Sequence, residues 1–488
     1  VRMYDGRIKM VQDVCVGDLL MGDDSSPRQV SATCTGTEEL FKVHQENGDA
    51  YVVIRSHILS LKCGMTNKKA KTYQRGKVED ISIVEYLNAS TKHKKYYKGY
   101  KVGVEYATKP VHLNPYILGY WLGNGTTGHP NFTVHEDHKA VISEIEAFAT
   151  TLGLACRIHQ DCGKGVSINV VGSKSKKNPF TEVLRGYEVS ENKHIPKTYL
   201  TNTKSVRMEV LAGLIDSDGH YDSTKNAYEV TFKSEMLADN LVELVRSLGY
   251  RATKAKKLCT WDSFTKGKLY QGSGYYFRTY IGGAGLDEIP VRLLYKKAVP
   301  KKSIRNSLLT KIKLEPIGIG EYFGFEINGN RRFLLGDFTV THNTSLALNI
   351  LNNTSKNDIS SVFFSMDMYG PLVYMKQIQK LEGLSGDEIH HIFKHDIKRR
   401  ASIKERLKEE YKNVKFSLKA GHTVQEMRDI ITSHQDTTGD KVKLVLIDYL
   451  ECISGPYSDP TANSARVAGE LRDFATEMAV CGACDLRL

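Results

Sequence analysis

The residues best suited to chemistry are three neighbours, His342, Asn343 and Thr344, which follow a short β-type run. An asparagine can attack its own backbone carbonyl through its side-chain amide, which closes a succinimide and releases the chain that follows. The adjacent histidine can donate a proton to the leaving amine as a general acid. Thr344 supplies a hydroxyl nucleophile on the far side of the same bond. The tripeptide alone is more typical of a strand end or turn, so the surrounding sequence decides.

The sequence changes character directly after Asn343. Residues 344–347 (TSLA) open an apolar helix of the kind that follows Gly-Lys in a phosphate-binding loop, but His342 and Asn343 occupy the place of that Gly-Lys. Half of a nucleotide site therefore begins behind an unrelated segment. The block RFLLGDFTVTHN, which ends at Asn343, resembles the C-terminal junction of an intein, a self-splicing insert. By this resemblance, which extends over nearly the whole chain, Thr344 is the first residue of the interrupted host protein.

The start of the chain also resembles an intein. Residues 4–7 (YDGR) predict a hairpin turn, and residues 11–22 (VQDVCVGDLLMG) are similar to the later part of the first splicing block. In the family that block opens with Cys or Ser several positions before the turn. Val1 lies too close to the turn and has no nucleophile, so we expect the chain to begin inside the block, without the N-terminal nucleophile.

A second splicing block is indicated by the alternating residues 51–61, which carry His57. The resemblance implies that His57 protonates the scissile amide at the N-terminal junction. Ile54 stands where the family usually has Thr or Asn, which weakens the hydrogen bonding expected around His57. Many inteins also have an Asp near the position of Gly324, and its absence leaves one assisting group unassigned.

Residues 115–125 (PYILGYWLGNG) and 210–220 (VLAGLIDSDGH) form an internal repeat, and the second is a near-complete LAGLIDADG motif. This resembles the homing endonucleases carried inside inteins. The resemblance implies two helices that pack through small residues, a shared Mg²⁺ site at their C-terminal ends, and β-sheets that lie in the major groove of duplex DNA.

The catalytic positions implied by this repeat are Asn124 and Asp218, with Lys193 as an accessory lysine. Active relatives have Asp at both helix ends, because two carboxylates hold the metal that activates water. An amide at position 124 should weaken Mg²⁺ binding, so we expect impaired cutting. For Lys193 an exposed loop lysine remains the alternative.

Residues 344–488 alternate helical patterns with buried strands, which predicts an α/β domain. The runs SVFFSMDM and KLVLIDYL each end a strand on an acid and resemble the RecA-like motor of replicative helicases. By that resemblance Thr344 binds the Mg²⁺ of ATP, Asp367 positions the attacking water, and Asp448 is the Walker B acid. We expect no further strand after Val480 and an ATPase that is incomplete in this chain.

Composition bears on partners and location. The formal net charge of +12 over 488 residues favours a polyanionic partner, and basic and aromatic residues interleave over residues 64–110, which suits either a nucleic-acid backbone or an exposed loop. The resemblances imply duplex DNA for the endonuclease and a ring-shaped homo-oligomeric host helicase on single-stranded DNA, while splicing needs no cofactor. With neither an apolar run of the ~20 residues of a membrane span nor a signal peptide, we expect a cytoplasmic or host-cell intracellular protein without a membrane partner.

The predicted organisation is multidomain. An all-β Hint splicing domain is formed by residues 1–109 and 301–343, an α+β LAGLIDADG endonuclease occupies residues 110–300, and a partial α/β RecA-like domain occupies residues 344–488. The predicted function is autocatalytic cleavage of the 343/344 bond as part of protein splicing, with an embedded endonuclease. The alternative is a DNA-binding or motor protein whose β segments are purely structural.

Overall fold

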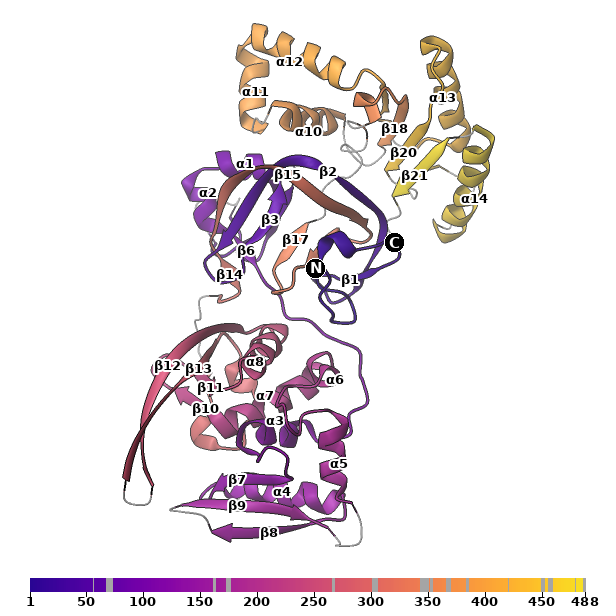
Figure 1. Cartoon of the computed structure of the whole chain (residues 1–488). Coiled ribbons are helices and arrows are strands. Elements are labelled where there is room, and N and C mark those ends of the chain that lie inside the picture. The colour runs from indigo at the N-terminus through magenta and orange to yellow at the C-terminus, as the bar shows by residue number, and fades with distance from the viewer. Residues whose placement is uncertain are drawn as a thin grey trace.

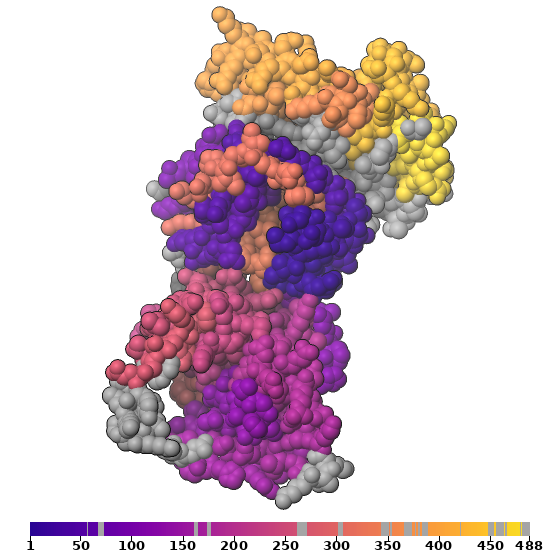
Figure 2. Space-filling view, viewed as in Figure 1, coloured from indigo at the N-terminus to yellow at the C-terminus, as the bar shows by residue number. Residues whose placement is uncertain are grey.

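The computed structural model describes residues 1–55, 57–66, 73–160, 164–172, 177–265, 268–300, 306–342, 351, 354–365, 370–382, 386–419, 421–448, 453–454, 460–478 and 480–485. They form a β-rich part from both ends of the first 342 residues, an α+β part between these ends, and a parallel-sheet part after residue 351 (Figure 1). In Figure 2 the indigo N-terminal atoms and the salmon atoms of residues 306–342 lie together in one body. The chain is multidomain, as the sequence predicted; the exact domain boundaries stay predictions.

Two long antiparallel strands organise the β-rich part. β2 (Pro27–Gln45) pairs with β15 (Ile312–Ile327) along nearly its whole length. This pairing joins segments that the entire α+β part separates in sequence, so the residues before and after that part close into one body. The strands predicted within 308–314 and 322–327 are thus mainly one continuous strand, whose pairing with β2 continues through a register shift between Pro316 and Gly318.

The remaining strands of this part are short. They are β1 (Leu19–Met21) and β3 (Tyr51–Ile54) beside β2, the sheet β14 (Leu309–Thr310), β6 (Tyr97–Tyr100), β4 (Ile58–Cys63) and β5 (Val78–Ser82), and the hairpin β16 (Arg332–Leu334) and β17 (Val340–His342). The part is β-rich rather than all-β, because it also contains η1 (Val11–Asp13), α1 (Ile83–Asn88) and α2 (Thr91–Tyr96). Ser82 and Glu85 form a capping box that starts α1, within the segment that the sequence left open as a loop.

Two central helices form the core of the α+β part. α3 (Pro115–Asn124) and α7 (Lys204–Asp218) pack so closely that a Cβ on Gly119 would stand 2.2 Å from the Val210 carbonyl oxygen, and a Cβ on Gly213 would stand 2.2 Å from that of Tyr116. Glycine is therefore required at both positions, as the internal repeat predicted.

Two antiparallel sheets flank these helices (Figure 1). One contains β7 (Asn131–His135), β9 (Gly165–Val171) and β8 (Ala155–Gln160), and the other contains β10 (Gly219–Asp222), β11 (Ala227–Phe232), β13 (Lys268–Gly282) and β12 (Arg251–Thr265). The remaining elements are α4 (Lys139–Thr151), α5 (Pro179–Gly186), α6 (Lys197–Leu200), α8 (Glu235–Ser247), η2 (Leu286–Glu288) and η3 (Leu294–Lys296). One continuous apolar core joins the central helices to both sheets and to α4 and α8.

The last part is a parallel sheet between two layers of helices. Its strands, in spatial order, are β19 (Val414–Ser417), β18 (Ser361–Ser365), β20 (Leu444–Asp448) and β21 (Cys481–Asp485). Phe363 packs towards α10 (Gly370–Glu382), α11 (Gly386–His395) and α12 (Ile397–Glu410). Val362 and Phe364 pack towards α13 (Val424–Thr438) and α14 (Pro460–Met478). Alternate side chains thus bury both faces, which is the α/β arrangement predicted.

One strand prediction was wrong. Residues 481–485, expected to carry no strand, form β21 and pair in parallel with β20 from Leu444 opposite Cys481 to Asp448 opposite Asp485. Cysteine, glycine and alanine give no strong β-signal, but the edge of an existing parallel sheet supplies the hydrogen-bond partners. Within the residues described, none of the helices is long and apolar enough to cross a membrane.

Candidate functional site

The predicted C-terminal junction lies at the end of the β16–β17 hairpin. Antiparallel pairing places His342 opposite Arg332. In the turn before β17, Phe338 takes a left-handed backbone conformation with φ of 68°, and its N–H donates to the Leu335 carbonyl at 3.0 Å. This conformation is uncommon for a bulky residue. The guanidinium of Arg2 lies 3.8 Å from the centre of the Phe338 ring and holds it in the core.

A buried ion pair anchors the same turn. The Lys101 ammonium donates to the Asp337 carboxylate and, at 3.2 Å, to the Asp337 carbonyl oxygen, and both side chains are more than nine-tenths buried. The Thr339 N–H donates to the other carboxylate oxygen at 3.1 Å. Burial raises the pKa of Asp337, but the Lys101 charge and these hydrogen bonds outweigh it and hold the pKa below its ordinary value.

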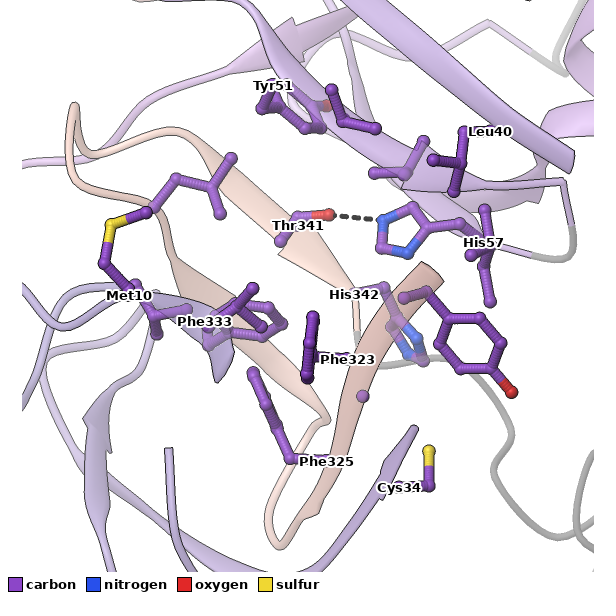
Figure 3. Close-up of a pocket in the computed structure, with 18 of the residues that line it drawn as sticks. Met10, Cys34, Leu40, Tyr51, His57, Phe323, Phe325, Phe333, Thr341 and His342 are labelled. Carbon is purple, nitrogen blue, oxygen red and sulfur yellow. Dashed lines mark hydrogen bonds between the residues drawn. The ribbon is translucent and has the colours of Figure 1, made fainter. Parts of the chain in front are cut away.

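His57 reaches this strand from the loop between β3 and β4. Its Nε2 atom lies 2.7 Å from Thr341 Oγ1, a hydrogen bond between residues 284 positions apart (Figure 3). Burial lowers the pKa of His57 to about 3, and the nearby His342 adds to the effect. The imidazole is therefore neutral at pH 7.

A cavity of about 400 Å³ opens beside these groups. Figure 3 shows His57, Thr341 and His342 along one side of it, with Tyr51, Phe323 and Phe333 among the side chains around them. Val1 and Ile54 also contribute to its lining. Ile54 has no polar atom in its side chain to offer His57, and the structure instead supplies the Thr341 hydroxyl from the C-terminal segment of the β-rich part.

Two further groups bear on this site. The position expected to carry an assisting Asp is Gly324, where a Cβ would stand 2.8 Å from Cys34 Sγ, and burial raises the pKa of the Cys34 thiol. Asp80 is an acid that sequence reasoning missed: it accepts from Arg332 Nη2 at 2.5 Å, and its carboxylate interacts electrostatically with His342. Asp80 lies within residues 64–110, where the sequence prediction rested on the basic and aromatic residues alone.

Some predicted site residues lie outside the described part of the chain. They are Asn343 and Thr344 at the junction, with the helix expected after them, and Asp367 in the α/β part. For Asp448 the backbone is described at the end of β20, but the side chain is not.

Asn124 and Asp218 are brought together at the C-terminal ends of α3 and α7. A Cβ on Gly123 would stand 2.5 Å from Asp218 Oδ2, so the Asp218 carboxylate lies against the end of the neighbouring helix. The Asn124 side chain is half-buried and hydrogen-bonds Tyr120. The structure thus places the two predicted positions in one site.

Lys193 belongs to the same site. Its Nζ donates to the carbonyl oxygens of Gly123 at 3.3 Å and Gly125 at 2.6 Å and lies 5.0 Å from the centre of the Trp121 ring. Burial lowers the pKa of Lys193 to about 8, although the Asp218 charge acts in the opposite direction. The side chain is half-buried against the end of α3, so it is not an exposed loop lysine.

Lys296 occupies a similar place beside the other helix and was not predicted. It is 7% exposed, and its Nζ donates to the carbonyl oxygens of Ile215 at 2.9 Å and Asp216 at 2.8 Å. Burial raises the pKa of Asp218, and the charges of Lys193 and Lys296 act against it. Asp218 as a whole residue is exposed to solvent, so the end of α7 remains accessible.

These donors offer a divalent cation one carboxylate and one amide oxygen. Mg²⁺ prefers carboxylate ligands, so Asp218 with Asn124 fits such a cation more weakly than two Asp residues would. Among the residues described, no cluster of three or more His, Cys, Asp or Glu side chains is arranged to hold a metal.

Three protein families match separate stretches of the chain. The family described as Hom_end-associated Hint matches residues 1–113, the Homing endonuclease family matches residues 194–273, and the DnaB-like helicase C terminal domain family matches residues 336–482. A Hint domain together with a homing endonuclease defines the class of inteins. The chain is an intein-containing DnaB-like helicase sequence.

Curated relatives agree with these matches. The replicative DNA helicase DnaB of Mycobacterium intracellulare is 26% identical over 399 residues, which are 75% of this chain and 61% of that protein. The homothallic switching endonuclease of Saccharomyces cerevisiae is 26% identical over 263 residues, which are 47% of this chain and 43% of that protein. The chain therefore spans less than two thirds of the length of either relative.

Similar solved structures cover smaller portions. A DnaB-like replicative helicase is 17% identical and covers 28% of this chain and 34% of that chain, with a TM-score of 0.25. A mesophilic variant of the homing endonuclease I-DmoI is 14% identical and covers 35% of this chain and 87% of that chain, with a TM-score of 0.23.

Proposed function

We propose that the β-rich part cleaves the peptide bond between Asn343 and Thr344 by asparagine cyclisation, as one step of protein splicing. The observation that carries the proposal is the meeting of His57 with Thr341 and His342 at one cavity that Val1 also lines. The segments of both predicted junctions thus reach the same place from opposite ends of the splicing part.

In the proposed reaction the side-chain amide nitrogen of Asn343 attacks its own carbonyl carbon. The bond from that carbon to the Thr344 nitrogen breaks, and a succinimide forms at residue 343. His342 gives a proton to the departing amine, and the Asn343 amide nitrogen loses one proton as the ring closes, so the step consumes no net proton. At the N-terminal junction of a complete intein, His57 would protonate the scissile amide nitrogen.

The α+β part is proposed to bind duplex DNA and to cleave its phosphodiester bonds weakly. Asp218 and Asn124 would hold a divalent cation, which when bound activates water and stabilises the leaving oxygen. Lys193, beside Asp218, would place a positive charge near the scissile phosphate. The match to the Homing endonuclease family supports DNA as the partner, and Asn124 in place of a carboxylate supports the weak activity.

The host protein is proposed to be a replicative helicase that acts as a ring-shaped homo-oligomer on single-stranded DNA. Thr344, Asp367 and Asp448 would serve its Mg²⁺–ATP site, with Asp448 as the Walker B acid. The parallel sheet in which Asp448 ends the buried strand β20 supports this assignment. We further propose that the protein works inside the cell, where duplex and single-stranded DNA are its partners.

The 343/344 bond provides the test. In the purified chain at neutral pH we expect slow cleavage there, and His342→Ala should slow it by ~10²–10⁴-fold, the usual effect of losing one positioned acid or base. His44→Ala is a matched control, because His44 is an exposed histidine of the same part that pairs with Glu315 away from the cavity. Equal cleavage rates in the unmodified and His342→Ala proteins would contradict the role of His342.

A further inference from the structure

Thr341 places a buried hydroxyl beside the two histidines, and no resemblance gives it a role. We propose that Thr341 is a positioning residue whose hydroxyl holds the His57 ring and thereby fixes His57 relative to His342. This inference rests on the proposed splicing function and names a residue of that same site.

The position of Thr341 makes the hydroxyl unusual. Thr341 is 2% exposed and lies opposite Phe333 in the hairpin, in a largely apolar environment. Valine has the same shape and suits a buried strand at least as well. A buried hydroxyl is unfavourable unless it forms a hydrogen bond, and His57 Nε2 at 2.7 Å provides one.

Two backbone hydrogen bonds hold the loop that carries His57. The His57 N–H donates to the Ile54 carbonyl at 3.0 Å, and the His57 carbonyl accepts from the Ile83 N–H at 3.0 Å. The contact with Thr341 acts on the imidazole itself and restrains its side-chain torsions. Because a neutral imidazole carries its proton on one nitrogen, a hydrogen bond at Nε2 also biases which nitrogen is protonated.

The same contact acts on the C-terminal junction. Thr341 immediately precedes His342 in β17, so a tie from the Thr341 side chain to the His57 loop also limits movement of His342. Displacing reacting groups by about 1 Å can cost roughly 10²-fold in rate. Loss of the hydroxyl should therefore slow cleavage at 343/344 without removing either histidine.

The first experiment compares Thr341→Val with Thr341→Ser. Valine keeps the shape and removes the hydroxyl, and serine keeps the hydroxyl. We expect Val to slow cleavage by about 10- to 100-fold and Ser to restore most of the rate, in line with the cost of misplacing a catalytic group. In a His57→Gln background Thr341→Val should add little further slowing, because the partner is already gone. Equal slowing by Val in both backgrounds, or no slowing at all, would overturn the inference.

The second experiment measures the tautomeric state of the His57 imidazole. Nitrogen NMR of His57 in the uncleavable Asn343→Ala chain should show a changed balance of the two neutral tautomers in Thr341→Val and the original balance in Thr341→Ser. An unchanged His57 spectrum in Thr341→Val contradicts the positioning role. Failure of the unmodified chain to cleave at 343/344 contradicts the proposed function instead, so the two failures are distinguishable.

Discussion

Arg2 and Glu243 form an ion pair that ties the splicing part to the endonuclease. Arg2 Nη1 lies 3.0 Å from Glu243 Oε1, and Arg2 Nη2 donates to the Gly336 carbonyl at 2.6 Å. Arg2 is 1% exposed, and Glu243 belongs to α8 of the α+β part. Arg2 Nη1 also donates to the Gly6 carbonyl oxygen at 3.2 Å. One guanidinium therefore contacts the N-terminal segment, the turn before His342 and an endonuclease helix. The endonuclease supplies one of the groups that hold the C-terminal junction.

Glu243→Ala should loosen the turn that leads to His342. Removing one partner of a fully buried ion pair lowers stability by roughly 3–5 kcal/mol. Because Glu243 is 30% exposed, we expect Glu243→Ala to lower the stability of this turn by about 1–2 kcal/mol. Hydrogen exchange at the amides of residues 334–342 should speed up by about tenfold or more. Asp239→Ala is the matched control, because Asp239 lies on the same helix and pairs with Lys254 within the endonuclease. Equal effects of both variants on exchange at residues 334–342 would contradict a role of the Arg2–Glu243 ion pair in stabilising this turn.

Low pH should destabilise the same turn by protonating Asp337. The pKa of Asp337 is held below its ordinary value of 3.8, so its stabilising contribution is complete above that value and is lost as the pH falls through the folded-state pKa. The protection of residues 334–342, corrected for the intrinsic pH dependence of amide exchange, should therefore fall below about pH 3.8. Asp337→Asn should show fast exchange already at neutral pH and a flatter profile. A profile in Asp337→Asn like that of the unmodified chain would show that the Lys101 pair does not hold the turn.

Asn124→Asp should raise DNA cleavage. The change gives the site a second carboxylate beside Asp218, which strengthens binding of Mg²⁺. The assay would follow cutting of a duplex selected for binding from a randomised library, and Asp218→Asn should abolish the residual activity. Asp137→Asn serves as a control at an exposed acid before α4. Rapid and equal cutting by the unmodified and Asn124→Asp chains would show that residue 124 is not the missing ligand.

The residual DNA cleavage of the unmodified chain should also depend on the charge of Lys193. The pKa of Lys193 is lowered to about 8, so its ammonium is present below that pH and is lost above it. Activity that needs the ammonium should fall as the pH rises through about 8. Lys193→Arg should remain charged over this range and remove the fall, if the longer side chain is accommodated, and Lys193→Met should be low throughout. A Lys193→Met chain with full activity and the same pH profile would exclude this role.

Local patterns in the sequence predicted the two central helices of the α+β part, whereas the splicing junctions stay predictions. The LAGLIDADG repeat located α3 and α7, because close helix packing requires Gly119 and Gly213 themselves. The acid and amide that end these helices were found for the same reason. The spacing of Lys193 before Pro196 recurs in Lys297 before Pro300, so this pattern indicates the neighbour of Lys296 rather than Lys296 itself.

Contacts between residues far apart in the sequence were not predictable. Thr341 binds His57 across 284 positions, and Asp80 meets Arg332 across 252, so neither pair leaves a local pattern. The short helix α1 was missed within a basic segment, although its Ser82–Glu85 capping box is a local signal. Strand β21 was missed because its stability comes from pairing with β20 rather than from its own residues.

The measurement that tests the central claim most directly is the intact mass of the chain and its Asn343→Ala variant after incubation at neutral pH. Cyclisation predicts two products from the unmodified chain: residues 1–343 with a mass lower by one water molecule than the hydrolysed fragment, and residues 344–488 with a free Thr344 amine. Asn343→Ala should stay whole, because alanine has no amide to attack. Cleavage after residue 343 that persists in Asn343→Ala, or an unmodified chain that remains intact for days, would contradict the mechanism.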